Sequence, residues 1–145
     1  MRALTTLCDR DASVAIDAIR KVLIERGKPA VIAVVDAHGE LLGLLRMSGA
    51  ALSSITVATN KAYSSARLRR PSAEIGKRVR HPETGIDISY YGDPRLTGFG
   101  GGLPVLVAGA VAGAVAVSGL TDAEDEELSA LGIAAILAAQ SSPTG

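Results

Sequence analysis

Residues 30–47 read A-V-I-A-V-V-D-A-H-G-E-L-L-G-L-L-R-M, in which two apolar runs flank a short polar turn. The first run, 30–36, is rich in β-branched residues, and the second run covers residues 41–47. The turn between them offers Gly39 for a positive φ angle. This pattern predicts an antiparallel β-hairpin. Because both runs are almost continuously apolar, we expect helices or a second subunit to cover both faces of the sheet.

Helical patterns lie on either side of this hairpin. Apolar residues recur at helical spacing over residues 9–26, and Gly27 stands where that helix should end. After the hairpin, residues 53–68 predict a helix with a narrow face of small residues, which lets it pack close to the sheet. Pro71 ends this helix, and Ser72 begins a short amphipathic one.

The C-terminal third repeats the hairpin and adds a last helix. Residues 103–108 and 111–118 predict two more strands joined by a tight turn. T-D-A-E, starting at Thr121, predicts a capping box at the start of the last helix, where its acidic residues also suit the helix dipole. The predicted order is helix, two strands, two helices, a long loop, two strands and a helix.

This order indicates an α+β domain with an antiparallel sheet. Residues 86–90 in the long loop are a candidate for a fifth, short strand. We expect one domain over residues 1–140 and a flexible tail over residues 141–145. The wide apolar stripe of the last helix predicts burial against further copies of the chain, and therefore a homo-oligomer.

Composition limits the classes of function. The chain has 145 residues, 48% of them hydrophobic, and its 15 basic and 15 acidic side chains cancel. A neutral chain gives no reason to expect nucleic acid, and the basic segment 67–80 lacks the interleaved aromatics that stack on bases. One cysteine and two histidines predict no metal cluster. The longest apolar run, 103–117, contains Pro104 and glycines, so we expect no membrane contact and a cytoplasmic location.

Several motifs carry a resemblance to a known family. They are V-V-D-A-H-G-E-L-L-G-L-L-R-M-S-G-A at 34–50, S-S-I-T-V-A-T-N-K-A at 53–62, R-R-P-S at 69–72, G-G-L-P-V at 101–105 and V-A-G-A-V-A-V-S-G at 111–119. In this order they resemble the GlcG/HbpS-like family, whose domain also forms the C-terminal part of PduO-type cobalamin adenosyltransferases.

The resemblance implies a profilin-like, three-layer α/β/α fold with a five-stranded antiparallel sheet. It also implies symmetric homo-oligomers, often octamers, and it makes haem or a related tetrapyrrole a candidate ligand because some members bind haem. No motif in this chain allows an axial haem ligand to be assigned from the resemblance.

Three cations predict an anion-binding pocket. Arg46 ends a predicted strand, Lys61 lies on the small-residue helix, and Arg95 follows a turn in the loop 81–102. We expect them to converge beneath this loop on a carboxylate, a phosphate or a haem propionate. The structural alternatives are an ion pair of Arg46 with an acid such as Asp36, and a Lys61 side chain that reaches solvent.

The loop supplies the remaining candidates. His81 is a candidate acid–base group or haem ligand, although a surface histidine at a helix end is the alternative. Tyr91 and Phe99 are expected to line the ligand, or else to anchor the loop on the sheet edge. The amides of Gly101 and Gly102 are candidates for assisting anion binding, or for close backbone approach.

These features leave three functions open. The first is a small-molecule-binding protein with haem or another small anionic ligand. The second is an isomerase, lyase or hydrolase acting on a small anionic or carbonyl-bearing metabolite, with Lys61, His81 and Arg95 as candidate catalytic residues. The third is a purely structural oligomer. We favour binding, because the resemblance points to it.

Overall fold

The computed structural model describes residues 1–141 and confirms the predicted order of elements. In sequence they are α1 (Asp9–Arg26), β1 (Val31–Asp36), β2 (Leu41–Arg46), α2 (Ser53–Leu68), α3 (Ser72–Val79), the 3-10 helix η1 (Ile88–Tyr91), β3 (Gly102–Val107), β4 (Ala110–Ser118) and α4 (Asp122–Ser141). Over this range, no helix combines the length and hydropathy needed to cross a bilayer. Of the predicted tail, Ser141 ends α4 and residues 142–145 lie outside the described residues. The single domain over residues 1–140 stays a prediction.

The sheet is antiparallel throughout, in the order β2-β1-β4-β3. The five-stranded sheet implied by the resemblance is wrong for residues 1–141, which contain four strands. The segment expected as a fifth strand instead contains η1. The Asp87 carboxylate accepts a hydrogen bond from the Ser89 amide at 2.9 Å, and Gly92 ends the turn with a φ of 66°. An aspartate that bonds the backbone two residues ahead favours a turn over an extended strand.

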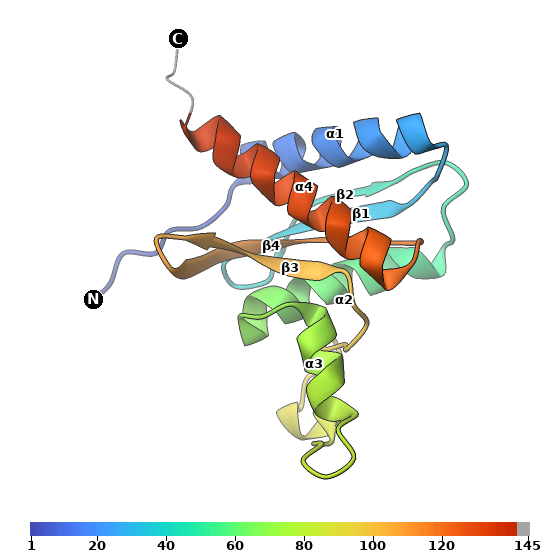
Figure 1. The fold of residues 1–145 in the computed structure, drawn as a ribbon. Coiled ribbons are helices and arrows are strands. Elements are labelled where there is room, and N and C mark those ends of the chain that lie inside the picture. Colours follow the sequence, from blue (N-terminus) through green and yellow to red (C-terminus); the bar gives the residue numbers. More distant parts are fainter. Residues whose placement is uncertain (142–145) are drawn as a thin grey trace.

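Helices cover both faces of the sheet, as the apolar hairpin predicted. α1 and α4 lie on one face and α2 lies on the other (Figure 1). Alternate residues of β1 point in opposite directions: Ile32 and Val34 belong to the core beneath α1 and α4, whereas Val31 and Val35 face α2. The face of α2 is built from alanines, so this helix packs close to the strands.

Gly113 on β4 is a position where the backbone approach requires glycine. A Cβ there would collide with the carbonyl oxygen of Val35 on β1 and would lie 2.7 Å from a methyl group of Leu7. Leu7 is itself buried, and its amide donates to the carbonyl of Ala112 at 2.8 Å. The absence of a side chain at Gly113 therefore allows the N-terminal segment to pack against the sheet.

We expect Gly113→Ala to lower the free energy of unfolding by about 1–3 kcal/mol, the usual cost of overpacking a core. Gly43→Ala is the control, because its Cβ would meet only side-chain atoms, with Ile16 at 3.0 Å and Ala12 at 3.1 Å. Urea denaturation measures both variants. Equal stability of the Gly113→Ala variant and the wild type would contradict the close approach of Gly113 and Val35.

Candidate functional site

A lobe projects from the sheet on the side of α2 (Figure 1). We call α3 together with residues 80–99 the α3 lobe. It contains two hollows on either side of Val79. The arginine cavity is lined by Leu68, Arg70, Ile75, Arg78, Val79, Ile86 and Tyr91. The phenylalanine groove is lined by Gly76, Val79, Arg80, Ile88, Leu96, Thr97, Gly98 and Phe99. The sequence-predicted loop therefore forms part of a ligand-sized surface.

One contact holds the lobe together, and a second fixes it to the body of the protein. Gly76 of α3 and Gly98 approach so closely that a Cβ on Gly76 would collide with the Gly98 carbonyl oxygen. The Thr97 amide donates to the Ser64 hydroxyl at 2.9 Å, which anchors the loop on α2. The small residues that the sequence placed on α2 and in the loop thus serve close packing.

Arg95 is held in place by contacts with Tyr63, Asp93 and Glu40. Its guanidinium stacks 3.9 Å from the centre of the Tyr63 ring and donates to the phenol oxygen at 2.7 Å. The phenol donates in turn to the Asp93 carboxylate, and Arg95 also pairs with Glu40 at 3.4 Å. Burial and the bond to Asp93 raise the pKa of Tyr63, whereas the bond from Tyr63 lowers the pKa of Asp93. Arg95 therefore ties the loop to α2 and to the first hairpin.

Lys61 is buried in an ion pair that the sequence analysis did not predict. Its ammonium lies 3.0 Å from Asp125 of α4 and 3.1 Å from the Val117 carbonyl, with the two side chains only 3% and 2% exposed. The second oxygen of Asp125 accepts from the Leu120 amide at 3.2 Å. Burial raises the pKa of Asp125, against the opposing effect of Lys61. Lys61 thus joins α2 to α4 at the end of β4.

The three cations expected to share a pocket do not meet. Arg46 is exposed at the end of β2, whereas the Glu40 partner of Arg95 precedes the start of that strand. Six strand residues at ~3.4 Å each separate these ends by roughly 20 Å. Lys61 is enclosed with its own acid. The prediction of one shared anion pocket is wrong, because Lys61 and Arg95 are already paired with acids of the fold.

The alternative prediction for Arg46 also fails. The Asp36 carboxylate accepts from the amides of His38 and Glu40, at 2.9 and 3.0 Å, and so stabilises the hairpin turn instead. Within residues 1–141, Arg46 has no ion-pair partner. Its predicted role in ligand binding stays a prediction.

The Gly102 amide and His81 have hydrogen-bond partners within the fold, and Gly101 is closely packed. The Gly102 amide donates to the Ser72 hydroxyl at 2.9 Å, and Gly101 packs so close that a Cβ would lie 2.9 Å from the Lys61 ammonium. Nδ1 of His81 accepts from the amides of Glu83 and Thr84, at 3.2 and 3.0 Å, which leaves the proton on Nε2. A metal-bound histidine normally donates from its second nitrogen, so this arrangement does not prepare His81 as an axial ligand.

The two aromatic candidates lie in different hollows. Tyr91 lines the arginine cavity, and Phe99 lines the phenylalanine groove. The candidates chosen from the sequence did not include Arg70, Arg78 and Arg80, which also line these hollows. The sequence signal that could have identified these arginines is the high density of cations in segment 67–80, directly before the loop 81–102.

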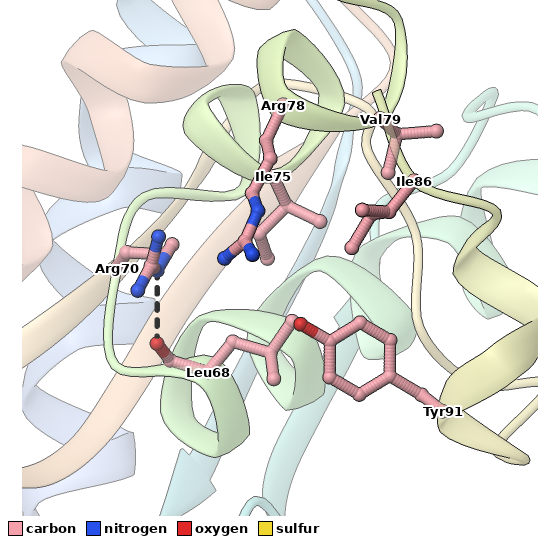
Figure 2. A pocket seen from close by; sticks show the side chains of 7 residues that line it. All are labelled: Leu68, Arg70, Ile75, Arg78, Val79, Ile86 and Tyr91. Carbon is pink, nitrogen blue, oxygen red and sulfur yellow. Dashed lines mark hydrogen bonds between the residues drawn. The ribbon is translucent and has the colours of Figure 1, made fainter. Parts of the chain in front are cut away.

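Figure 2 shows the arginine cavity, with the guanidinium groups of Arg70 and Arg78 and the hydroxyl of Tyr91 directed toward one apolar space. Arg70 donates from Nε to the Leu68 carbonyl at 3.2 Å. Neither arginine pairs with a carboxylate of residues 1–141. The same range contains no cluster of three or more His, Cys, Asp or Glu side chains that would hold a metal ion. The lobe therefore offers cations beside apolar walls.

Comparison with known proteins defines the class. Residues 7–134 match the family described as haem degrading protein HbpS-like, and the chain belongs to that family. This result confirms the resemblance identified from the sequence motifs.

The chain is similar to three known proteins or structures. Protein GlcG of Escherichia coli (strain K12) is 35% identical over 118 residues, covering 81% of this chain and 85% of that protein. The crystal structure of the Klebsiella pneumoniae protein ORFY has a TM-score of 0.89 and 31% identity, with 95% of both chains covered. A PduOC:heme complex has a TM-score of 0.82 over 90% of this chain and 95% of that chain; at 24% identity this likeness shows the fold.

We expect Lys61→Met to lower the free energy of unfolding by about 3–5 kcal/mol, because it leaves the Asp125 carboxylate buried without its cation. The double variant Lys61→Met, Asp125→Leu should recover most of that loss, since no charge then remains buried. Urea denaturation of the single and double variants measures this coupling. A single variant as stable as the wild type would exclude the structural role of Lys61.

Proposed function

We propose that this protein binds a planar, anionic and largely apolar small molecule in the phenylalanine groove, with haem or a related tetrapyrrole as the leading candidate. One observation carries the proposal: Phe99 and Arg80 line the same groove. An aromatic ring beside a guanidinium matches a flat ligand that carries carboxylates. Membership of the HbpS-like family and the haem complex of a structural neighbour support the choice of haem.

Phe99 supports this proposal through its exposure. It is the one phenylalanine of the chain, and 59% of its surface is accessible. Burying a phenylalanine side chain contributes about 1.5–3 kcal/mol of stabilisation. Because the Phe99 ring is exposed although its loop is fixed to the body, a ligand that covers the ring would gain this free energy on binding. Thr97 and Gly98, directly before it, are both held on helices.

Arg80 supplies the charge on the opposite wall. Its guanidinium lies over Gly76, where a Cβ would be 2.8 and 2.9 Å from the two terminal nitrogens. No carboxylate of residues 1–141 pairs with it. Arg80 is therefore available to bind a carboxylate of the ligand through a bidentate contact.

The groove fits part of a tetrapyrrole and provides no iron ligand. Its volume is about 270 Å³, just below the ~300–1,000 Å³ typical of ligand pockets. A bound tetrapyrrole would therefore remain partly exposed to solvent or contact a second copy of the chain. Within residues 1–141, the groove lining includes no His, Cys, Met or Tyr. Haem, when bound, supplies a planar macrocycle, two carboxylates and an iron atom; the residues present contact the ring and a carboxylate.

The enzymatic alternative has lost its proposed site. It depended on a pocket of Arg46, Lys61, Arg95 and the glycine amides acting on a small metabolite, and the structure does not assemble that pocket. Binding therefore remains the function that the geometry supports best. The cytoplasmic location stays a prediction.

We also propose that the chain forms a homo-oligomer through β3 and α4. Leu106 on the edge strand β3 is 54% exposed. Together with Leu103, Pro104 and Ile133 it forms the apolar part of an open hollow of about 440 Å³, whose lining also includes Arg69, Arg70 and Glu74. An apolar edge strand left unpaired invites association, and a second copy would cover it. The number of subunits, for which the resemblance suggests eight, belongs to the same proposal.

Titration of the protein with haemin and with metal-free protoporphyrin, followed by absorption and fluorescence, tests the ligand proposal. We expect the two dissociation constants to agree within about threefold, because the groove contacts the ring and a carboxylate. Phe99→Ala and Arg80→Gln should each weaken binding about tenfold, corresponding to ~1.4 kcal/mol.

Matched controls are available for both substitutions. Tyr90→Ala removes an aromatic side chain that is 89% exposed and lines neither hollow, and Lys77→Gln removes a cation from the same helix. Both controls should bind like the wild type. Binding of haemin without binding of protoporphyrin would show ligation of iron by the protein and would overturn the groove as the site.

Light scattering tests the oligomer proposal. We expect the wild type to have a mass that is a multiple of 14.8 kDa, and Leu106→Glu to reduce it, because a charge on an edge strand opposes pairing. Leu52→Glu is the control, since Leu52 is exposed far from β3, before α2. A monomeric wild type at micromolar concentration would refute the proposal.

A further inference from the structure

We infer that the arginine cavity is a second, separate site that binds a compact carboxylate, the acid group of a small organic acid with a short apolar chain. This inference does not depend on the proposed function, because the two hollows share only Val79 in their linings. The observation behind it is an apolar cavity lined by two guanidiniums and a phenol hydroxyl, in which neither guanidinium forms an ion pair with an acid of residues 1–141 (Figure 2).

The polar groups of the cavity select an anion. Arg70 comes from the connection between α2 and α3, Arg78 from the last turn of α3, and Tyr91 from η1 (Figure 2). Two like charges facing one cavity repel each other unless an anion lies between them. Guanidinium groups bind carboxylates through paired hydrogen bonds, and the phenol can donate a further one.

The protein does not supply that anion itself. Two acids are adjacent in sequence to lining residues: Asp87 accepts from the Ser89 amide at 2.9 Å within its own turn, and Glu74 forms no ion pair with Arg70 or Arg78. Arg26, Lys28 and Lys61, by contrast, each pair with an acid of α4 at 3.0 Å or less. These three cations are neutralised within the body of the fold, whereas Arg70 and Arg78 line the cavity without an ion-pair partner among residues 1–141.

The remaining walls and the volume limit the ligand. Leu68, Ile75, Val79 and Ile86 are apolar and contact whatever lies beyond the acid group. The cavity volume is about 40 Å³, which is roughly three times the ~10–15 Å³ that one water molecule needs. This space accommodates a carboxylate with a few methylene groups and excludes a tetrapyrrole ring. The apolar walls favour a carboxylate over phosphate, whose four oxygens would require more donors.

The test is a titration of isotopically labelled protein with propionate, propionamide and inorganic phosphate, followed by amide and arginine Nε chemical shifts. Propionamide has nearly the same shape as propionate and carries no charge. We expect propionate to shift the Arg70 and Arg78 signals and to bind at least tenfold more tightly than propionamide. Equal affinity for the two, or tighter binding of phosphate than of propionate, would overturn the inference.

Substitutions assign the binding to this cavity. Arg78→Gln should weaken propionate binding at least tenfold, and Tyr91→Phe should weaken it about threefold, whereas Lys77→Gln on the same helix should leave it within twofold of the wild type. Arg78 is exposed. The amide spectrum of the Arg78→Gln variant reports whether that variant remains folded. Unchanged propionate affinity in a folded Arg78→Gln variant would overturn the site.

Haemin titration of the same variants separates this inference from the proposed function. Arg78→Gln should bind haemin within twofold of the wild type, and Arg80→Gln should bind propionate within twofold. Competition between propionate and haemin for one site would overturn the separation of the two hollows. Failure of haemin binding with propionate binding intact would leave this site in place and contradict only the proposed function.

Discussion

The buried ion pair between Lys61 and Asp125 connects the parts of this fold that packing alone leaves separate. α2 and α4 lie on opposite faces of the sheet, and the pair joins them at the end of β4, where the Lys61 ammonium also donates to the Val117 carbonyl. Gly101 packs directly against both charged side chains. Since residues 80–99 lead into this glycine, the position of the α3 lobe depends on the pair.

The main elements of the fold could be predicted because their signals are local. The apolar runs on both sides of Gly39 predicted β1 and β2, and Gly27 ends α1 with the expected left-handed conformation. The predicted fifth strand was wrong because a short-range bond from the Ser89 amide to Asp87 outweighs the β-propensity of Ile86 and Ile88. That competition is decided by a single side chain, which a pattern of apolar residues does not reveal.

The site was harder to predict because pairing between distant charges decides which cations are free. Lys61 was chosen as a ligand-binding residue because it lies on a helix of small residues, and Arg95 because it follows a turn in the loop 81–102. The fold brings Asp125 to Lys61 across 64 positions of sequence and Glu40 to Arg95 across 55. No spacing rule connects such residues. Tyr91 and Phe99 could be placed in the functional loop, but the separation of that loop into two hollows by α3 required the structure.

The net charge of zero conceals an uneven distribution of acids and bases along the chain. The acids at the start of α4 are used within the body: Asp122 accepts from the Gly100 amide, and Glu124, Asp125 and Glu127 pair with Lys28, Lys61 and Arg26. The basic segment 67–80 contains one acid, Glu74, and no acid of residues 1–141 forms an ion pair with Arg70, Arg78 or Arg80. These three side chains line the apolar hollows of the α3 lobe and are exposed to solvent. Because the acids of α4 are paired within the body, these guanidiniums are the groups through which the proposed anionic ligands would bind.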